Sequence, residues 1–315
     1  MEQHQRILPI SLLIPTMNRP NGLERTLRSY LSADAWPSHI VIVDQSEDDL
    51  TKRLVEKISI DYPTISIEYL YQSLPSLTCA RNNAFRLSQN EIIVFSDDDV
   101  DVYHDTLYHV YDIMSSSDVA MLAATNDEEN GKSSPIGFFV GTRSFPKRKR
   151  GHVTKSVLGR YPDSVKGSIS TEWAMGYFFA VKKSLVEKWQ IKWDENLTSY
   201  AYAEDLDFSY TYFKKSRNEK LKCILDERVH VRHLASREYR VPSRKSTYMY
   251  VLNRAYLSHK HEMGISSRFA IAWCDFFRLL FRILKKENPS DMIDAQKYLR
   301  RHRKEIQRGK LYYNF

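Results

Sequence analysis

Residues 91–101, EIIVFSDDDVD, decide how this chain folds and where its chemistry lies. A strand-forming apolar run, residues 92–95, gives way to three consecutive carboxylates, Asp97, Asp98 and Asp99. Like charges at the end of a buried strand repel one another unless a cation lies among them, and a hard divalent ion with oxygen ligands, Mg²⁺ or Mn²⁺ rather than zinc, fits best. Such an ion keeps positions open for phosphate oxygens, so the segment indicates a nucleotide-diphosphate substrate. For an isolated DDD run, an acidic turn that caps the next helix is the alternative.

Composition and charge limit the classes of partner. The chain has 315 residues, 42% hydrophobic and 27% charged, which suffices for one large α/β domain or two smaller ones. The formal net charge is +8, and residues 264–315 hold twelve Lys/Arg against five Asp/Glu, a balance of +7. A nearly neutral main body with a basic last segment argues against a nucleic-acid partner and indicates an anionic one for that segment.

Several features favour a cytoplasmic protein. The three cysteines, Cys79, Cys223 and Cys274, are odd in number and lack metal-like spacing, which is typical of reduced thiols. The first apolar run is short and interrupted by Pro9 and Pro15, so it predicts a core strand rather than a signal peptide. Because no uncharged apolar run reaches about 20 residues, no simple transmembrane helix is expected.

The first half of the chain alternates short apolar runs with amphipathic helical patterns, which predicts a mostly parallel α/β sheet flanked by helices. Strands are expected at residues 10–14, 40–43, 65–71, 92–95, 119–124 and 177–181. Asp105 is expected to cap the helix after the acidic run, and a later helix should begin near Glu204. Polar segments follow the first, second and fourth strands, and ligands of open α/β sheets bind at the carboxyl ends of strands. We therefore expect one site assembled from distant parts of the chain.

A series of motifs over residues 8–255 resembles the family-2 inverting glycosyltransferases of the bacterial surface-polysaccharide type. The matching segments, in order, are IPTMNR, IVDQS, ARNNAF, FSDDDV, GYFFAVKKSL, AEDLDF and a later His-containing strand. The resemblance implies the GT-A fold, a Rossmann-like and mostly parallel sheet flanked by helices. It also implies transfer of a sugar, with inversion, from a nucleotide-diphosphate sugar to a hydroxyl of a glycan or lipid-linked oligosaccharide. A UDP-sugar is the first choice of donor.

Several residues suit the binding of such a donor. Pro15 and Thr16 end the first strand, where their backbone groups can line a nucleobase pocket, and Arg19 can reach phosphate. The resemblance assigns Asp44 to the base. Arg81 is expected to open a helix, where its guanidinium and the helix N-terminal amides both favour a diphosphate.

The resemblance also implies a metal set. Asp97 and Asp99 match the DxD pair that holds the ribose and the metal, with Mg²⁺ or Mn²⁺ as the cofactor. Asp98 between them is a further carboxylate of the donor site, so the choice of ligand among the three stays open. His233 matches a position near the metal or diphosphate, and a packed strand histidine is its alternative.

The catalytic assignment rests on Glu204 and Asp205, which resemble the ED motif whose Asp is the general base. A positioned carboxylate that takes the acceptor's proton contributes about 10²–10⁴-fold. The alternative is a helix N-terminus enriched in negative charge. Gly176 would let the backbone approach the donor sugar closely.

Residues 1–240 are predicted to form the catalytic domain and residues 241–315 a helical extension. At helical spacing, residues 265–286 separate charged side chains from a broad aromatic and apolar face. This predicts either a helix lying on an anionic membrane, at its cytoplasmic side, or a helix packed on the catalytic domain. Deletion from Ile265 onward is expected to release the protein from the membrane while preserving donor hydrolysis.

Two other functions are open to this sequence. A sugar nucleotidyltransferase would need a glycine-rich phosphate loop after the first strand, and PTMNRP lacks one. A catalytically inactive scaffold of a polysaccharide-assembly complex is disfavoured by Asp97, Asp99 and Asp205. Residues 126–167 and 236–244 carry no pattern that predicts the base, the sugar or the acceptor.

Overall fold

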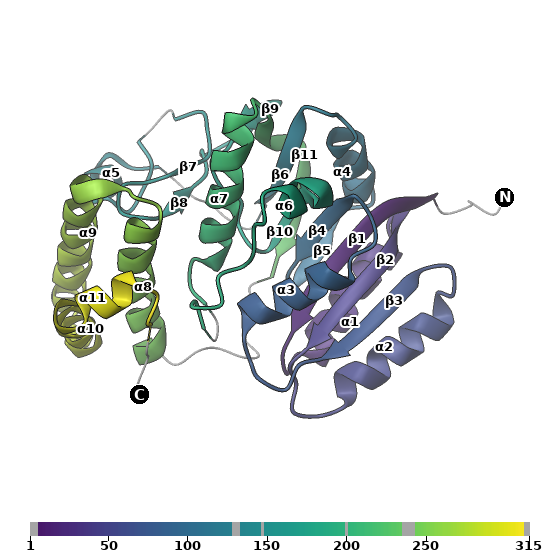
Figure 1. Cartoon of the computed structure of the whole chain (residues 1–315), viewed down its shortest axis with the longest axis horizontal. Helices are drawn as coiled ribbons and strands as arrows, with labels where there is room; N and C mark the ends of the chain where they lie inside the picture. The colour runs from purple at the N-terminus through teal and green to yellow at the C-terminus, as the bar shows by residue number, and fades with distance from the viewer. Residues whose placement is uncertain (1–5, 128–132, 146–147, 199–200, 235–242, 312–315) are drawn as a thin grey trace.

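A computed structural model describes residues 6–127, 133–145, 148–198, 201–234 and 243–311. These residues build a nine-stranded sheet of order β3-β2-β1-β4-β10-β6-β11-β5, with β9 paired to β11 (Figure 1). The strands are β1 (Arg6–Thr16), β2 (Ala35–Asp44), β3 (Ser66–Tyr71), β4 (Ile92–Ser96), β5 (Val100–Val102), β6 (Val119–Asn126), β9 (Ser168–Ser170), β10 (Phe178–Lys182) and β11 (Lys222–His233). Every strand predicted from the sequence is present, with ends that differ by a few residues.

The sheet is mostly parallel, as the alternation of strands and helices predicts. β1 runs parallel to β2 and β4, and β2 to β3. β10 is inserted antiparallel between β4 and β6. Because β1, β2 and β4 point the same way, the polar segments that follow them meet at one edge.

Helices cover both faces of the sheet. On one face lie α1 (Pro20–Leu31), α2 (Leu50–Asp61) and α4 (Thr106–Met114), and on the other lie α3 (Leu77–Leu87), α6 (Lys183–Lys188) and α7 (Glu204–Asn218). Strand β1 shows how this two-sided core arises, because successive side chains of a strand point to opposite faces. Ile10 and Leu12 pack on the first face and Leu13 on the second.

The predicted C-terminal extension is helical. It comprises α8 (Ser243–Lys260), α9 (Gly264–Leu284), α10 (Ser290–Arg301) and α11 (Arg303–Gln307), which gather at the end of the molecule away from α2 and β3 (Figure 1). Buried residues of these helices form a third apolar cluster together with Leu197, Ala201 and Leu206. The extension therefore packs against the segment that leads into α7. The proposed boundary at residue 240 lies outside the described residues.

The segment predicted to be irregular has few regular elements where it is described. These are α5 (Pro135–Phe139) and the paired strands β7 (His152–Val153) and β8 (Gly159–Arg160). Among the described residues, no helix is long and apolar enough to cross a membrane.

One capping prediction was wrong. Asp105 does occupy the N-cap position of α4, but its side chain accepts no hydrogen bond from the helix backbone. Its carboxylate Oδ2 lies 3.2 Å from Nε2 of His109 instead. The hydroxyl of Thr106 accepts a hydrogen bond from the backbone N–H of Tyr103, which stabilises the turn into the helix.

Candidate active site

The acidic run follows β4 at the edge where β1 and β2 also end. Asp98 is buried, and its carboxylate accepts hydrogen bonds from Oγ1 of Thr16 at 2.7 Å and Nη1 of Arg19 at 3.0 Å. The same Arg19 nitrogen lies 3.4 Å from Oδ2 of Asp99. The structure thus brings together residues that lie far apart in the sequence.

Asp97, Asp99 and His233 form a cluster that could hold a metal ion. Each offers one ligand atom, and these atoms lie within 4.8 Å of one another. Nε2 of His233 is 3.2 Å from Oδ1 of Asp99, and its ring stacks on Tyr177 with centroids 5.1 Å apart. Two carboxylates and one imidazole suit Mg²⁺ or Mn²⁺, since hard oxygen donors predominate.

The electrostatics of the run also fit a cation. Burial raises the pKa of Asp98 to about 7, although Arg19 and Thr16 act in the opposite direction. Burial likewise raises the pKa of Asp97, against the influence of Arg81. The nearby guanidinium groups therefore offset only part of the cost of burying these charges, and a divalent ion would offset more.

Arg81 joins the acidic run to the ED pair. Its side chain is 2% exposed, and it donates from Nη2 to Oδ1 of Asp97 at 2.8 Å and from Nη1 to Oε1 of Glu204 at 3.2 Å. Its guanidinium also lies 4.4 Å from the ring centroid of Trp193. The prediction that Arg81 opens a helix was wrong, because α3 begins at Leu77 and Arg81 belongs to its second turn.

Glu204 and Asp205 begin α7, as predicted. Oδ2 of Asp205 accepts from the backbone N–H of Gly176 at 2.8 Å, and Oδ1 accepts from the N–H of Leu206 at 2.7 Å. Burial raises the pKa of Asp205, against the Gly176 hydrogen bond. Burial and then the neighbouring Asp205 raise the pKa of Glu204 well above its usual range. A carboxylate with a raised pKa is a stronger base once it is deprotonated.

The backbone before the ED pair is strained. Ala201 and Ala203 have φ of 51° and 68°, in the left-handed region that residues with a Cβ rarely occupy. Such conformations cost about 1–3 kcal/mol each and persist where the surroundings impose them. Ala201 is fully buried in the third apolar cluster, which supplies that constraint. No pattern in the sequence predicted the left-handed conformation of these two alanines.

Gly176 lies where Arg81 and Asp205 approach each other. A Cβ at this position would come within 3.1 Å of both Nη2 of Arg81 and Cβ of Asp205. The carbonyl of Gly176 also accepts a hydrogen bond from Nη2 of Arg81 at 3.1 Å. The missing side chain therefore makes room for these two functional groups; the predicted approach to a donor sugar stays a prediction.

Pro15, Thr16 and Asp44 lie at the same edge, on neighbouring strands. Pro15 is opposite Val43 and Thr16 opposite Asp44 in the parallel register. Asp44 is fully buried, accepting from the hydroxyl of Tyr69 at 2.8 Å and from the N–H of Ser46 at 2.9 Å. These two partners orient its carboxylate, and no motif in the sequence predicts either of them.

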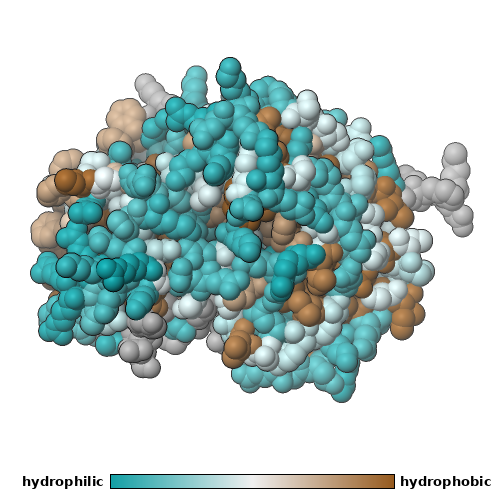
Figure 2. All heavy atoms as spheres, viewed as in Figure 1, coloured by the Kyte–Doolittle hydropathy of each residue, from teal (hydrophilic) through white to brown (hydrophobic). Residues whose placement is uncertain are grey.

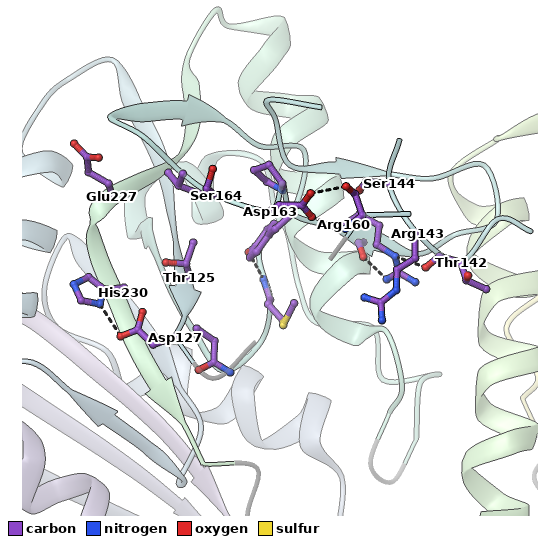
Figure 3. Close-up of a pocket in the computed structure, with 17 residues that line it drawn as sticks. Thr125, Asp127, Thr142, Arg143, Ser144, Arg160, Asp163, Ser164, Glu227 and His230 are labelled. Carbon is purple, nitrogen blue, oxygen red and sulfur yellow. Dashed lines mark hydrogen bonds and ion pairs between the residues drawn. The ribbon is translucent and has the colours of Figure 1, made fainter. Parts of the chain in front are cut away.

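A cavity of about 830 Å³ adjoins the site on the β6 and β11 side (Figure 3). Its lining is mainly polar and includes Thr125, Asp127, Arg143, Arg160, Tyr161, Asp163, Met175, Glu227 and His230. Met175 precedes Gly176, and its N–H donates to the hydroxyl of Tyr161 at 2.8 Å. The cavity therefore extends to Met175, the residue before Gly176, whose N–H binds Asp205. Most of its wall comes from residues 126–167, where no periodic pattern predicted it.

Comparison with known families identifies the class of protein. The model of the family described as "Glycosyl transferase family 2" matches residues 11–188, more than half of the chain. This chain belongs to glycosyl transferase family 2 and is a glycosyltransferase. No curated protein sequence matches it.

Solved structures agree on the GT-A fold. Mannosyltransferase PcManGT from Pyrobaculum calidifontis, in complex with GDP-Man and Mn²⁺, has a TM-score of 0.55 at 14% identity, covering 98% of this chain and 86% of that one. S. aureus TarS 1-349 has a TM-score of 0.54 at 16% identity, with 96% and 88% covered. GalNAc-T7 with UDP, GalNAc and Mn²⁺ has a TM-score of 0.57 at 14% identity, with 88% and 58% covered.

Proposed function

We propose that this glycosyltransferase moves a sugar from a nucleotide-diphosphate sugar to a hydroxyl of a glycan or lipid-linked acceptor, with inversion and with Mg²⁺ or Mn²⁺. One observation carries the proposal: the ligand atoms of Asp97, Asp99 and His233 lie within 4.8 Å of one another at the end of β4. Arg81 connects this cluster to the ED pair, since it contacts both Asp97 and Glu204.

The nucleotide would lie over the ends of β1 and β2. Pro15 and Thr16 supply backbone groups there, and the oriented carboxylate of Asp44 can accept from a base N–H. A UDP-sugar is the first donor to test. TarS 1-349 has been solved with UDP-GlcNAc, at a TM-score of 0.51 and 17% identity over 79% of this chain and 66% of that one. GDP-Man, the donor bound to PcManGT, is the second.

Asp97, Asp99 and His233 would hold the metal, which supplies Lewis-acid stabilisation of the nucleoside-diphosphate leaving group when it is bound. Asp98 keeps its hydrogen bonds to Thr16 and Arg19, and this fixes Arg19 beside the diphosphate position. A guanidinium there adds positive charge where negative charge develops.

Asp205 would be the general base. Its two hydrogen bonds to backbone N–H groups fix the carboxylate, and burial makes it more basic than an exposed Asp. In one displacement the acceptor oxygen bonds to the anomeric carbon, the bond to the diphosphate breaks, and the hydroxyl proton passes to Asp205. The polar cavity beside Met175 suits a polyhydroxylated acceptor.

The proposed setting is the cytoplasmic side of a membrane, in surface-polysaccharide assembly. The balance of +7 over residues 264–315 supports an anionic surface as the neighbour of the C-terminal segment.

A donor panel tests the proposal. The protein is incubated with UDP-, GDP- and dTDP-sugars in Mn²⁺ or in excess EDTA, and release of the nucleoside diphosphate is measured. We expect hydrolysis of at least one donor with Mn²⁺ and none with EDTA. Full activity in EDTA, or release of a sugar phosphate rather than a nucleoside diphosphate, would contradict it. Once a donor is found, NMR of the first-formed sugar should show inverted anomeric configuration.

A further inference from the structure

Helix α9 packs on the protein through one narrow side, while its charged residues Arg268 and Arg278 stay exposed. Its buried positions are Ser267, Ile271, Cys274 and Asp275, which face the rest of the molecule. The opposite side is apolar and exposed, with Phe269 at 72%, Trp273 at 44% and Phe276 at 57% exposure. Ile265 and Ile283 continue the same exposed side toward the two helix ends.

Two charged residues of α9 have partners within the protein. Asp275 is 2.6 Å from Nη1 of Arg254 on α8, and it accepts from Nε2 of Gln296 on α10 at 2.7 Å. The guanidinium of Arg278 lies 4.1 Å from the ring centroid of Tyr250. A helix on the surface of a globular protein normally buries its apolar side. Here one side of the helix packs on the protein and the apolar side is left for a partner.

Helix α5, distant in the sequence, extends the apolar surface. The ring of Phe139 is 5.4 Å from that of Trp273 and 6.0 Å from that of Phe277, and Nε1 of Trp273 donates to the carbonyl of Phe139. Ile136, Phe138 and Phe139 are all exposed. We call this surface, made of Ile136, Phe138, Phe139, Ile265, Phe269, Trp273, Phe276 and Ile283, the aromatic face. Brown atoms mark part of it in Figure 2, along the edge where Figure 1 draws α5 and α9.

The charge of the two segments that carry the aromatic face selects its partner. A contiguous apolar surface of this kind marks an interaction site. Residues 133–162, which include α5, hold seven Lys/Arg and no Asp/Glu, and residues 264–315 carry +7. Two copies of this surface would bring like charges together, whereas anionic headgroups would offset them. We propose that the aromatic face docks this protein on an anionic lipid bilayer, with its rings among the acyl chains and the basic residues at the headgroups.

The same segment forms a wall of the cavity. Thr142, Arg143 and Ser144, which line it, follow shortly after α5. Gly141 packs on α9, since a Cβ there would be 3.5 Å from Cβ of Cys274. On the docking proposal, the bilayer lies next to the segment that continues from α5 into this wall of the cavity. On the proposed function, a lipid-linked acceptor can reach the cavity while its lipid stays in the membrane.

Vesicle binding tests the docking surface directly. Full-length protein is sedimented with vesicles of phosphatidylcholine alone or with about one third phosphatidylglycerol. The test variant is Phe269→Ser/Trp273→Ser/Phe276→Ser, and the matched control replaces exposed apolar residues elsewhere, Leu50→Ser/Ile60→Ser/Leu74→Ser. We expect binding to the anionic vesicles, a loss of roughly tenfold or more in the partition coefficient of the test variant, and none in the control.

Trp273 provides a second readout, because its fluorescence should shift to the blue on anionic vesicles if the ring enters the bilayer. In Trp273→Phe the shift should vanish while binding persists. Equal binding by the test variant and the control would overturn the proposal, as would failure of the wild type to bind anionic vesicles. A third outcome is a wild type that forms a dimer and does not bind vesicles, and a test variant that is a monomer. It would show that the aromatic face binds a second copy of the chain instead of a bilayer.

These assays contain no donor, so their outcome does not depend on the glycosyl-transfer proposal. Conversely, the test variant should hydrolyse the donor in solution as the wild type does, because its three substitutions lie on the outer side of α9. If donor hydrolysis failed in every protein while vesicle binding followed the expected pattern, the proposed function would fail and the docking surface would stand.

Discussion

At the scale of single residues, the site is a chain of buried charges. Arg81 contacts Asp97 on one side and Glu204 on the other, so the residues of two distant motifs share one guanidinium. Asp98 has its own partners, Thr16 and Arg19. Both carboxylate oxygens of Asp205 accept from backbone N–H groups and not from a cation. The carboxylate therefore keeps its negative charge and can accept a proton.

Substitution of the proposed base gives the first prediction at this scale. Asp205→Asn should lower kcat by about 10²–10⁴-fold, because the acceptor's proton then has no carboxylate to receive it. Nucleotide affinity, measured by calorimetry, should stay nearly unchanged. Asp207→Asn removes another carboxylate of the same helical turn; it also loses the buried contact of Asp207 with Lys260, yet it should retain far more activity as long as the protein stays folded. If the two variants lost activity equally, Asp205 would contribute only negative charge to the helix N-terminus, and its assignment as the base would be wrong.

The pH dependence of kcat gives a second prediction. Since burial raises the pKa of Asp205, the carboxylate becomes protonated at a higher pH than an exposed Asp does. A protonated Asp205 cannot accept the acceptor's proton, so kcat should fall as the pH drops through this raised pKa. A pH–rate profile with its acid limb in the usual range of an exposed Asp would contradict the assignment.

At the scale of secondary-structure elements, the sequence predicts the strands well and their surroundings less well. Apolar runs and the polar residues after them fix where β1, β2 and β4 end. The prediction that Arg81 opens a helix overlooked the N-cap at Ser76, whose hydroxyl accepts from the N–H of Cys79, so that α3 begins at Leu77. The contact of Arg81 with Glu204 joins residues far apart in the chain, which no local pattern predicts. Periodicity showed which residues of α9 share a side but not which side faces inward, since that depends on Arg254 and Tyr250 of α8.

The contact between α8 and α9 leads to the third prediction. Arg254 and Asp275 are 0% and 3% exposed, and removing one partner leaves a buried charge without the other. Arg254→Met should therefore lower the free energy of unfolding by about 3–5 kcal/mol. Urea denaturation measures this. The control, Arg53→Met, removes the exposed pair with Asp49 and should cost at most about 1 kcal/mol. Equal losses would show that the buried pair adds little.

At the scale of the whole molecule, the C-terminal helices and the catalytic part share apolar packing. Leu197, Ala201 and Leu206, around the start of α7, belong to the same cluster as residues of α8 to α11. The cavity wall also depends on α9, through Gly141 and through the hydrogen bond from Ser267 to the carbonyl of Lys155. Residues 126–167, whose sequence predicted nothing, are shaped by these contacts where the structure describes them.

This packing revises the expectation that deletion from Ile265 onward preserves donor hydrolysis. The deletion removes Asp275 and leaves Arg254 without it, and it exposes apolar residues of α8. We predict a lower melting temperature and weaker donor hydrolysis in the truncated protein, whereas the Ser substitutions in the aromatic face should spare both. A truncated protein as stable and active as the full chain would show that the extension is independent.

The central claim is that Asp97, Asp99 and His233 hold a divalent metal with the nucleotide. The most direct test is titration of Mn²⁺ into the protein with UDP or GDP, followed by the electron paramagnetic resonance signal of free Mn²⁺. We predict that the wild type removes Mn²⁺ from solution in the presence of nucleotide and that Asp97→Asn/Asp99→Asn does not, while remaining folded by circular dichroism. Equal Mn²⁺ uptake by the two proteins, or none by the wild type, would contradict the account.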